Sequence, residues 1–184
     1  REIYIESTKP VIDSVEIGAT QTVIEGGTKN IIFNFTATDR DGVSTLNGAT
    51  AKAQFNKSGE TTRVNNSCNW FSNLNSTTAK YTCTIGIEFY DGPGDWTVNV
   101  SIKDNSNSLA ERISTTFLLQ ETISINLTVN ISLNEHDIIW NYSLFGGETN
   151  KKASNYLIIT NIGNKNINLS INATDLIGED QIER

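Results

Sequence analysis

The chain is poor in charge, and it contains no long apolar run. Of its 184 residues, 19% are charged, and the formal net charge is −7. This excess of negative charge argues against nucleic acid or anionic lipid as a partner, because both bind to basic surfaces. No run of about 18 apolar residues occurs, so we expect no helical membrane span. The sequence also shows no signal peptide, and since Arg1 is not a natural start we expect a processed or partial product.

Cysteine and histidine are equally scarce, with two cysteines and one histidine. Cys68, Cys83 and His136 cannot supply the four ligands of a zinc site. In a secreted chain, two cysteines predict one disulfide, which would close a loop of about 15 residues and contribute roughly 3 kcal/mol. The alternative is a pair of buried free thiols.

Features of an enzyme are missing too. There is no glycine-rich phosphate loop, and no spacing of Asp and Glu singles out a catalytic pair. His136 lies between Glu135 and Asp137, whose side chains would face the other side of a strand. We therefore expect a protein that is not an enzyme.

What the chain does have is polar, uncharged residues arranged with a period of two. It contains 23 Asn, 16 Ser and 22 Thr. In "KNIIFNFTAT" the residues Ile31, Phe33, Phe35 and Ala37 face one way, and the polar residues between them face the other. The same alternation recurs in "AKYTCTIGIEF" and "DWTVNVSIKD", whereas no stretch has a persuasive helical period. The sequence therefore predicts an all-β fold.

The strands fall into two groups. About seven strands between residues 10 and 120, the first two near 10–17 and 20–25, are separated by turn clusters such as "DRDG" and "DGPGD". This pattern is typical of an antiparallel immunoglobulin-like β-sandwich. Residues 121–184 contain only four apparent strands, over 123–133, 137–145, 154–163 and 167–178, which are enough for one sheet that still needs a cover. We expect two tandem modules, the second short or completed by another chain.

Residues 1–9 are predicted to form an N-terminal strand and linker. The strand is a candidate donor to a neighbouring copy, because an unpaired strand at one end and an incomplete sheet at the other suit strand exchange between subunits. Its candidate exchange residues are Glu2, Ile3, Tyr4, Ile5 and Glu6.

Asn-x-Ser/Thr triplets, the acceptor signal for N-linked glycans, occur ten times, whereas composition alone would give roughly five. In a strand the Asn and the hydroxyl residue share one face while the residue between them points to the core, as in "ETISINLTVNISLN". The simpler interpretation is a polar solvent face that creates triplets by chance; the functional one is a glycan coat that replaces surface charge. The predicted acceptors are Asn34, Asn56, Asn65, Asn75, Asn99, Asn126, Asn130, Asn141, Asn168 and Asn172.

Three carboxylates follow predicted core strands. Asp39 and Asp41 lie in "TDRDGV", and Asp104 lies in "IKDNSN". In an immunoglobulin-like sandwich these two loops lie at the same end, so the carboxylates could form a calcium site. The simpler interpretation, which we favour on sequence alone, is that Asp and Asn form turns.

The segments "TKPVIDSVEIG", "FNFTATDRDGV" and "GDWTVNVSIKDNSN" resemble the immunoglobulin-like repeats of microbial, especially archaeal, cell-surface proteins. "YLIITNIGNKNINLSINATD" is similar to the adhesion-type β-sandwich modules found beside them. This resemblance implies a cell-surface location, surface layers or filaments as assemblies, N-linked glycans and bound calcium.

From these observations we expect a structural subunit of an extracellular, glycosylated homopolymer, such as a surface layer, filament or tube. Its partners would be copies of itself. The alternative is an adhesin or receptor-binding module, possibly viral, that recognises sugar or protein through loops 39–48 and 68–76, where Trp70 is the one tryptophan expected to be exposed.

Overall fold

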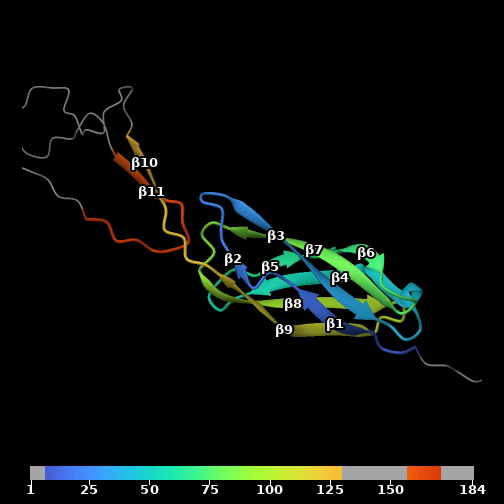
Figure 1. Cartoon of the computed structure of the whole chain (residues 1–184). Coiled ribbons are helices and arrows are strands. Elements are labelled where there is room, and N and C mark those ends of the chain that lie inside the picture. The colour runs from blue at the N-terminus through green and yellow to red at the C-terminus, as the bar shows by residue number, and fades with distance from the viewer. Residues whose placement is uncertain (1–6, 130–156, 171–184) are drawn as a thin grey trace, which may run out of the picture.

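The computed structural model describes residues 7–129 and 157–170 (Figure 1). Within these ranges the chain is built of β-strands, with one short 3₁₀ turn, η1, at Val43–Thr45. The strands are β1 Val11–Glu16, β2 Thr20–Gln21, β3 Thr28–Thr38, β4 Leu46–Asn56, β5 Arg63–Asn65, β6 Asn69–Asn73, β7 Thr78–Glu88, β8 Gly94–Asp104, β9 Leu109–Leu119, β10 Ile125–Val129 and β11 Leu157–Asn161.

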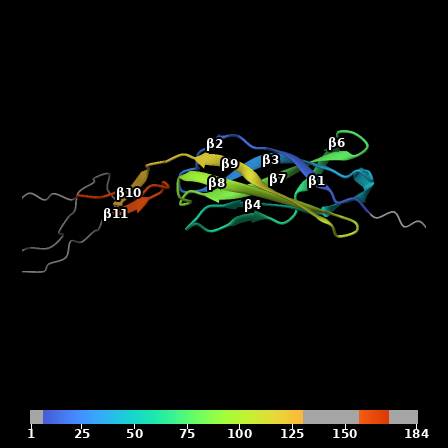
Figure 2. The ribbon, with the colours of Figure 1, turned by 90° about the horizontal axis from the view of Figure 1, so that it is seen from below.

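The first nine strands form two sheets that pack face to face. One sheet has the order β1-β3-β7-β6, and the other has the order β2-β9-β8-β4-β5. Their pairings are antiparallel except that β2 runs parallel to β9. In both ribbon views the strands run along one long direction of the module (Figures 1 and 2). The predicted all-β, sandwich-like fold is therefore confirmed.

The core follows from the alternation of the sequence. Phe33, Phe35, Phe55 and Trp96 are each at most 1% exposed, and each such aromatic contributes about 1.5–3 kcal/mol by leaving water. The ring centroids of Phe33 and Phe55 are 5.2 Å apart, and Phe55 meets Phe117 edge-on at 4.8 Å. Since β3 and β4 belong to different sheets, the Phe33–Phe55 contact joins the two layers.

Strand β6 was not predicted, and the reason is physical. Its segment "NWFSN" has no buried alternating side chains, so it carries no period-two signal. It forms through backbone pairing along the edge of the sheet, with Trp70 opposite Tyr81. The strand predicted over 20–25 is also shorter in the structure, where only Thr20–Gln21 pair with β9.

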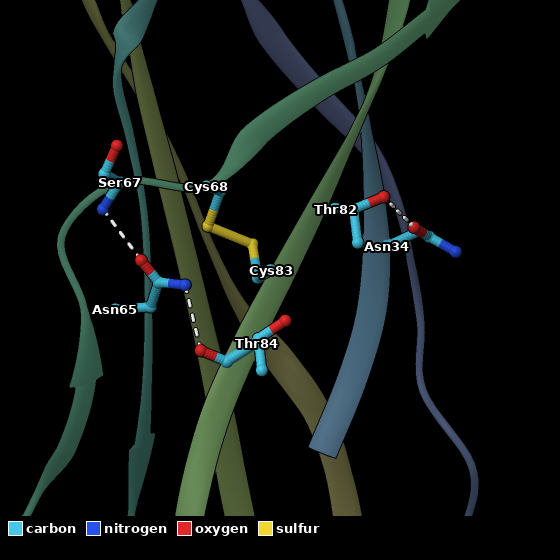
Figure 3. The surroundings of a disulfide bond; sticks show 7 residues. All are labelled: Asn34, Asn65, Ser67, Cys68, Thr82, Cys83 and Thr84. Atoms are coloured by element: carbon cyan, nitrogen blue, oxygen red, sulfur yellow. Dashed lines mark hydrogen bonds between the residues drawn. A yellow bond between two sulfur atoms is a disulfide. The ribbon is translucent and has the colours of Figure 1, made fainter. Parts of the chain in front are cut away.

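The predicted disulfide is present. Cys68 and Cys83 are bonded with a Cα–Cα distance of 4.5 Å. Cys68 lies where the chain leaves β5 in one sheet and enters β6 in the other, and its N–H donates to the Ala51 carbonyl of β4 at 2.9 Å. The bond to Cys83 on β7 therefore fastens the crossover between the sheets (Figure 3).

Beyond the sandwich, β10 and β11 pair antiparallel, with Asn126 opposite Thr160. They belong to the predicted strands 123–133 and 154–163. The predicted strand 137–145 lies outside the described residues, as do residues 171–178 of the predicted strand 167–178, whose described part, 167–170, is not a strand. A complete second sandwich therefore stays a prediction.

The turn between Asn161 and Lys165 holds this second pair of strands against the end of the first module. The Asn164 side chain accepts from the Thr122 N–H at 2.6 Å and donates to the Gln120 carbonyl at 2.9 Å. Gly26, whose φ is +65°, donates its N–H to the Ile162 carbonyl at 2.9 Å. Asn164 is only 8% exposed, so a buried amide closes the junction between the two units.

Candidate functional site

The structure brings the three predicted carboxylates to one end of the sandwich. Asp39 follows β3, Asp41 lies in the same turn, and Asp104 ends β8. The Ser7 hydroxyl lies 3.3 Å from Asp104 Oδ2 and 3.5 Å from Asp41 Oδ2. The Thr8 N–H donates to Asp41 Oδ2 at 2.6 Å. Asp41 and Asp104 therefore share the Ser7 hydroxyl where the N-terminal segment joins the module, and Ser7 is a contact that sequence analysis missed.

The same residues also form turns, as the simpler interpretation requires. Asp39 Oδ1 accepts from the Asp41 N–H at 2.9 Å. Asp104 Oδ1 accepts from the Ser106 hydroxyl and from the Ser108 N–H, both at 2.7 Å. These Asx-type contacts use one oxygen of each carboxylate and leave the second one for other partners.

Asp39 is unusual because its second oxygen has no partner. Asp39 and Asp104 are both 0% exposed, and Asp39 Oδ2 is buried without a hydrogen bond. None of the ion pairs between described residues involves Asp39, Asp41 or Asp104. A buried carboxylate normally needs a cation or several hydrogen-bond donors, so this end has excess buried negative charge.

The donor set fits a hard cation only in part. Within residues 7–129 and 157–170, no three His, Cys, Asp or Glu side chains form a ready ligand group. Calcium takes six to eight oxygen ligands, many from backbone carbonyls and water. Asp39 Oδ2 and Asp41 Oδ1, which accept no described hydrogen bond, would therefore supply part of its shell, together with Asp104 Oδ2 and the Ser7 hydroxyl that now donates to it.

The protonation of Asp104 reflects two opposing influences. Burial is the largest and favours the neutral acid, but hydrogen bonds from Ser106, Ser108 and Ser7 favour the carboxylate. Their net effect holds the pKa of Asp104 below its ordinary value. Asp104 is thus a buried carboxylate kept charged by the turn around it.

At the opposite end the acidic loop "YDGPGD" is structural. Asp91 is 1% exposed and receives two hydrogen bonds from Arg63, at 2.5 and 3.0 Å. The Asp91 hydrogen bond also raises the pKa of Arg63 above its ordinary value. Trp96 Nε1 donates to the Gly92 carbonyl at 3.1 Å, so this loop leads the chain into the core.

The predicted glycan acceptors differ in accessibility. Asn75 and Asn168 are exposed. Asn75 Oδ1 accepts from both the N–H and the hydroxyl of Thr77, at 2.8 and 3.0 Å. Since no described contact uses its Nδ2, Asn75 presents the atom that a glycan would join.

Three further acceptors are half-buried and already bonded, and Figure 3 shows two of them, Asn34 and Asn65. Asn34 accepts from the Thr82 hydroxyl at 2.7 Å, and Asn56 accepts from Thr62 at 3.0 Å. Asn65 donates to the Thr84 carbonyl at 2.9 Å and accepts from the Ser67 N–H at 2.8 Å. A glycan at any of them must share space with these contacts.

Asn99 departs from the expected solvent-facing pattern. It is only 9% exposed, although alternation places it on the outer face of β8. Asn126 lies within β10, whereas Asn130, Asn141 and Asn172 fall outside the described residues. The candidate exchange residues 2–6 and His136 also fall outside them.

An exposed apolar cluster lies on the edge strand β6 and just after it. Trp70, Phe71 and Leu74 are 60%, 63% and 56% exposed. Trp70 Nε1 donates to Asn73 Oδ1 at 3.0 Å, which holds the indole on the surface. We call these three residues the β6 cluster; its tryptophan was predicted to be exposed, but Phe71 and Leu74 were not singled out.

Comparison with known proteins finds no matching family model and no matching curated sequence. In the described ranges, no helix has the length and apolar character needed to cross a membrane. The disulfide is compatible with an extracellular protein, because disulfides persist in oxidising environments.

Proposed function

We propose that the chain is a structural subunit of an extracellular, glycosylated homopolymer whose sandwich modules are linked end to end. The observation that carries the proposal is the path of the chain. It enters the sandwich at Thr8, beside the acidic end, and leaves after Leu119 at the opposite end, where β10 and β11 follow (Figure 1). Modules with this path can be joined in a row along one axis, as a filament or layer requires.

The segments by which the chain enters and leaves the sandwich are both hydrogen-bonded in place. Ser7 and Thr8 are held by Asp41 and Asp104, and the linker after β9 is held by Asn164. Fixed junctions favour a defined angle between successive units over a freely hinged tether. The strand order also supports the immunoglobulin-like topology expected from sequence, with β1-β3-β7-β6 facing β9-β8-β4.

Calcium bound at the acidic end would strengthen the junction between the N-terminal segment and the sandwich. A cation shared by Asp39, Asp41, Asp104 and Ser7 would join the N-terminal segment to the loops after β3 and β8. It would also neutralise the buried charge of Asp39, which lacks a partner for Oδ2.

Thermal unfolding of the full chain with and without calcium tests this site. At a calcium concentration 100 times the dissociation constant, binding should add about 2.7 kcal/mol of stability. Asp39→Asn should weaken the response, because the amide that replaces the carboxylate is uncharged. Without calcium this variant should be at least as stable as the original chain, because it removes an unpaired buried charge. Asp95→Asn, an exposed change at the other end, is the control. An unchanged response in Asp39→Asn would show that the charge of Asp39 does not contribute to calcium binding.

Assembly is tested separately, by sedimentation of the full chain over a wide concentration range and by electron microscopy. We expect concentration-dependent, linear association that weakens when residues 1–6 are deleted. A chain that stays monomeric at high concentration contradicts the proposal.

The β6 cluster favours a second candidate, an adhesin or receptor-binding module. Tryptophan is enriched at binding hot spots, and phenylalanine is enriched at protein interfaces. A Trp70→Ser/Phe71→Ser variant separates the two functions. Loss of glycan-array or receptor binding by a monomer would support the adhesin, whereas loss of self-association would support the homopolymer.

A further inference from the structure

A pocket of about 100 Å³ opens on the outer face of the five-stranded sheet. This space is several times what one water molecule needs. Four segments of the chain line it. They contribute Lys52, Ala53 and Gln54 from β4, Val64 and Asn66 from β5 and the residue after it, Asn99 and Ser101 from β8, and Glu111 from β9.

The register explains why these side chains converge. Gln54 lies directly opposite Asn99, and Lys52 lies opposite Ser101 on the neighbouring strand. Ser101 in turn lies opposite Glu111 on β9. The β8–β9 register shifts next to Asn99, and such irregularities often re-aim side chains at functional positions.

The burial and hydrogen bonding of Asn99 distinguish this pocket from an ordinary polar surface. It is 9% exposed, and its Oδ1 is buried without a hydrogen-bond partner. Leaving an acceptor buried and unsatisfied costs about 1–3 kcal/mol. Across the described residues, none of the polar side chains around it, Lys52, Gln54, Asn66, Ser101 and Glu111, makes a side-chain hydrogen bond or ion pair. The pocket therefore has several donors and acceptors without protein partners, arranged around an acceptor that needs a donor.

The chemistry of the lining selects the class of ligand. One Lys and one Glu leave the pocket without net charge, and the remaining groups are amides and a hydroxyl. An anion would meet the Glu111 carboxylate and the Asn99 carbonyl oxygen, and a metal ion would find a single carboxylate. A sugar hydroxyl both donates and accepts, and the C–H surface of a sugar ring can pack on Val64.

We propose that this pocket binds one edge of a neutral sugar, whose hydroxyls hydrogen-bond to Asn99 and to the polar side chains around it. The triplet at Asn99 then serves as part of a binding site and carries no glycan itself. The proposal goes beyond the structural role above and does not depend on it.

The test is titration of the full chain with single neutral monosaccharides, glucose, mannose, galactose and N-acetylglucosamine, followed by amide chemical shifts. We expect at least one of them to bind with a millimolar dissociation constant and to shift residues of β4, β8 and β9. Asn99→Leu should weaken that binding about tenfold, the value of one hydrogen bond. Ser101→Ala, which alters the same pocket with little risk to the core, should also weaken it. Asn75→Leu, at an exposed triplet outside the pocket, is the matched control and should bind normally.

Three results would overturn the proposal. One is the absence of shifts around the pocket with all four sugars. The second is equal binding by the original chain, Asn99→Leu and Ser101→Ala. The third is a glycan covalently attached to Asn99 in native material. None of them bears on whether the chain assembles, so this test and the sedimentation test fail independently.

Discussion

At the N-terminal end of the sandwich, hydrogen bonds from Ser7, Ser106 and Ser108 favour the charged form of one carboxylate, Asp104. Because the pKa of Asp104 is lowered in the folded chain, its stabilising contribution is fully present above its unfolded value, about 3.9, and is lost as pH falls through the folded pKa.

Acid unfolding should therefore depend on this residue. In the original chain, the free energy of unfolding should fall as pH drops below about 4, and Asp104→Asn should lose part of that dependence. Denaturant unfolding at a series of pH values measures it. Identical pH profiles for the two chains would show that Asp104 has the same pKa folded and unfolded.

Glycan occupancy is a second property decided residue by residue. Exposure and a free Nδ2 predict a glycan at Asn75, and exposure predicts one at Asn168, whereas burial predicts that Asn99 is bare. Mass spectrometry of peptides from native material, before and after enzymatic deglycosylation, checks each position. A bare Asn75 beside a modified Asn99 would contradict the role of accessibility.

At the scale of elements, the crossover between the sheets depends on the disulfide. Cys68→Ala/Cys83→Ala should lower the free energy of unfolding by roughly 3 kcal/mol, because the unfolded chain regains loop entropy. Denaturant midpoints for the oxidised original chain, the reduced original chain and the variant measure this. If reduction and the double substitution both leave the midpoint unchanged, the bond does not hold the crossover.

The side-chain amide of Asn164 makes two of the hydrogen bonds at the junction between the two units. Asn164→Ala leaves the Thr122 N–H and the Gln120 carbonyl without their side-chain partner, a local cost of about 1–3 kcal/mol. We expect faster hydrogen exchange and proteolysis across residues 120–124, with the sandwich unchanged. Asn166→Ala, at an exposed position nearby, should behave as the original chain does. Equal protection in both variants would remove Asn164 from the junction.

The sequence was most informative where alternating residues are buried. Ile31, Phe33 and Phe35 fixed the core face of β3, and each is at most 3% exposed. It failed at β6, which has no buried face, and at Asn99, because alternation identifies the outer side of a sheet but not what covers it. The cysteine pair and the turn residues were local signals, so they were predicted.

The candidate sites were only partly readable from sequence. Loop position brought Asp39, Asp41 and Asp104 to one end, as the topology of a sandwich requires. The roles of Ser7 and Asn164 were not predictable, because each depends on a contact between segments distant in the chain. The pocket around Asn99 depends on the register of β4, β8 and β9, which no single strand encodes.

At the scale of the whole molecule, the chain passes from one end of a rigid sandwich to the other. In the proposed homopolymer, entry and exit at opposite ends would let a series of such units extend in one direction, and neighbouring copies would supply contacts at edges such as the β6 cluster. A polar exterior that carries glycans would then limit association to those contacts.

The most direct test of this account is the state of association of the full chain as its concentration rises, followed by sedimentation and imaged by electron microscopy. The account predicts linear assemblies that lengthen with concentration and shorten when residues 1–6 are removed. A monomer that persists at the highest concentration, with or without calcium, would contradict it.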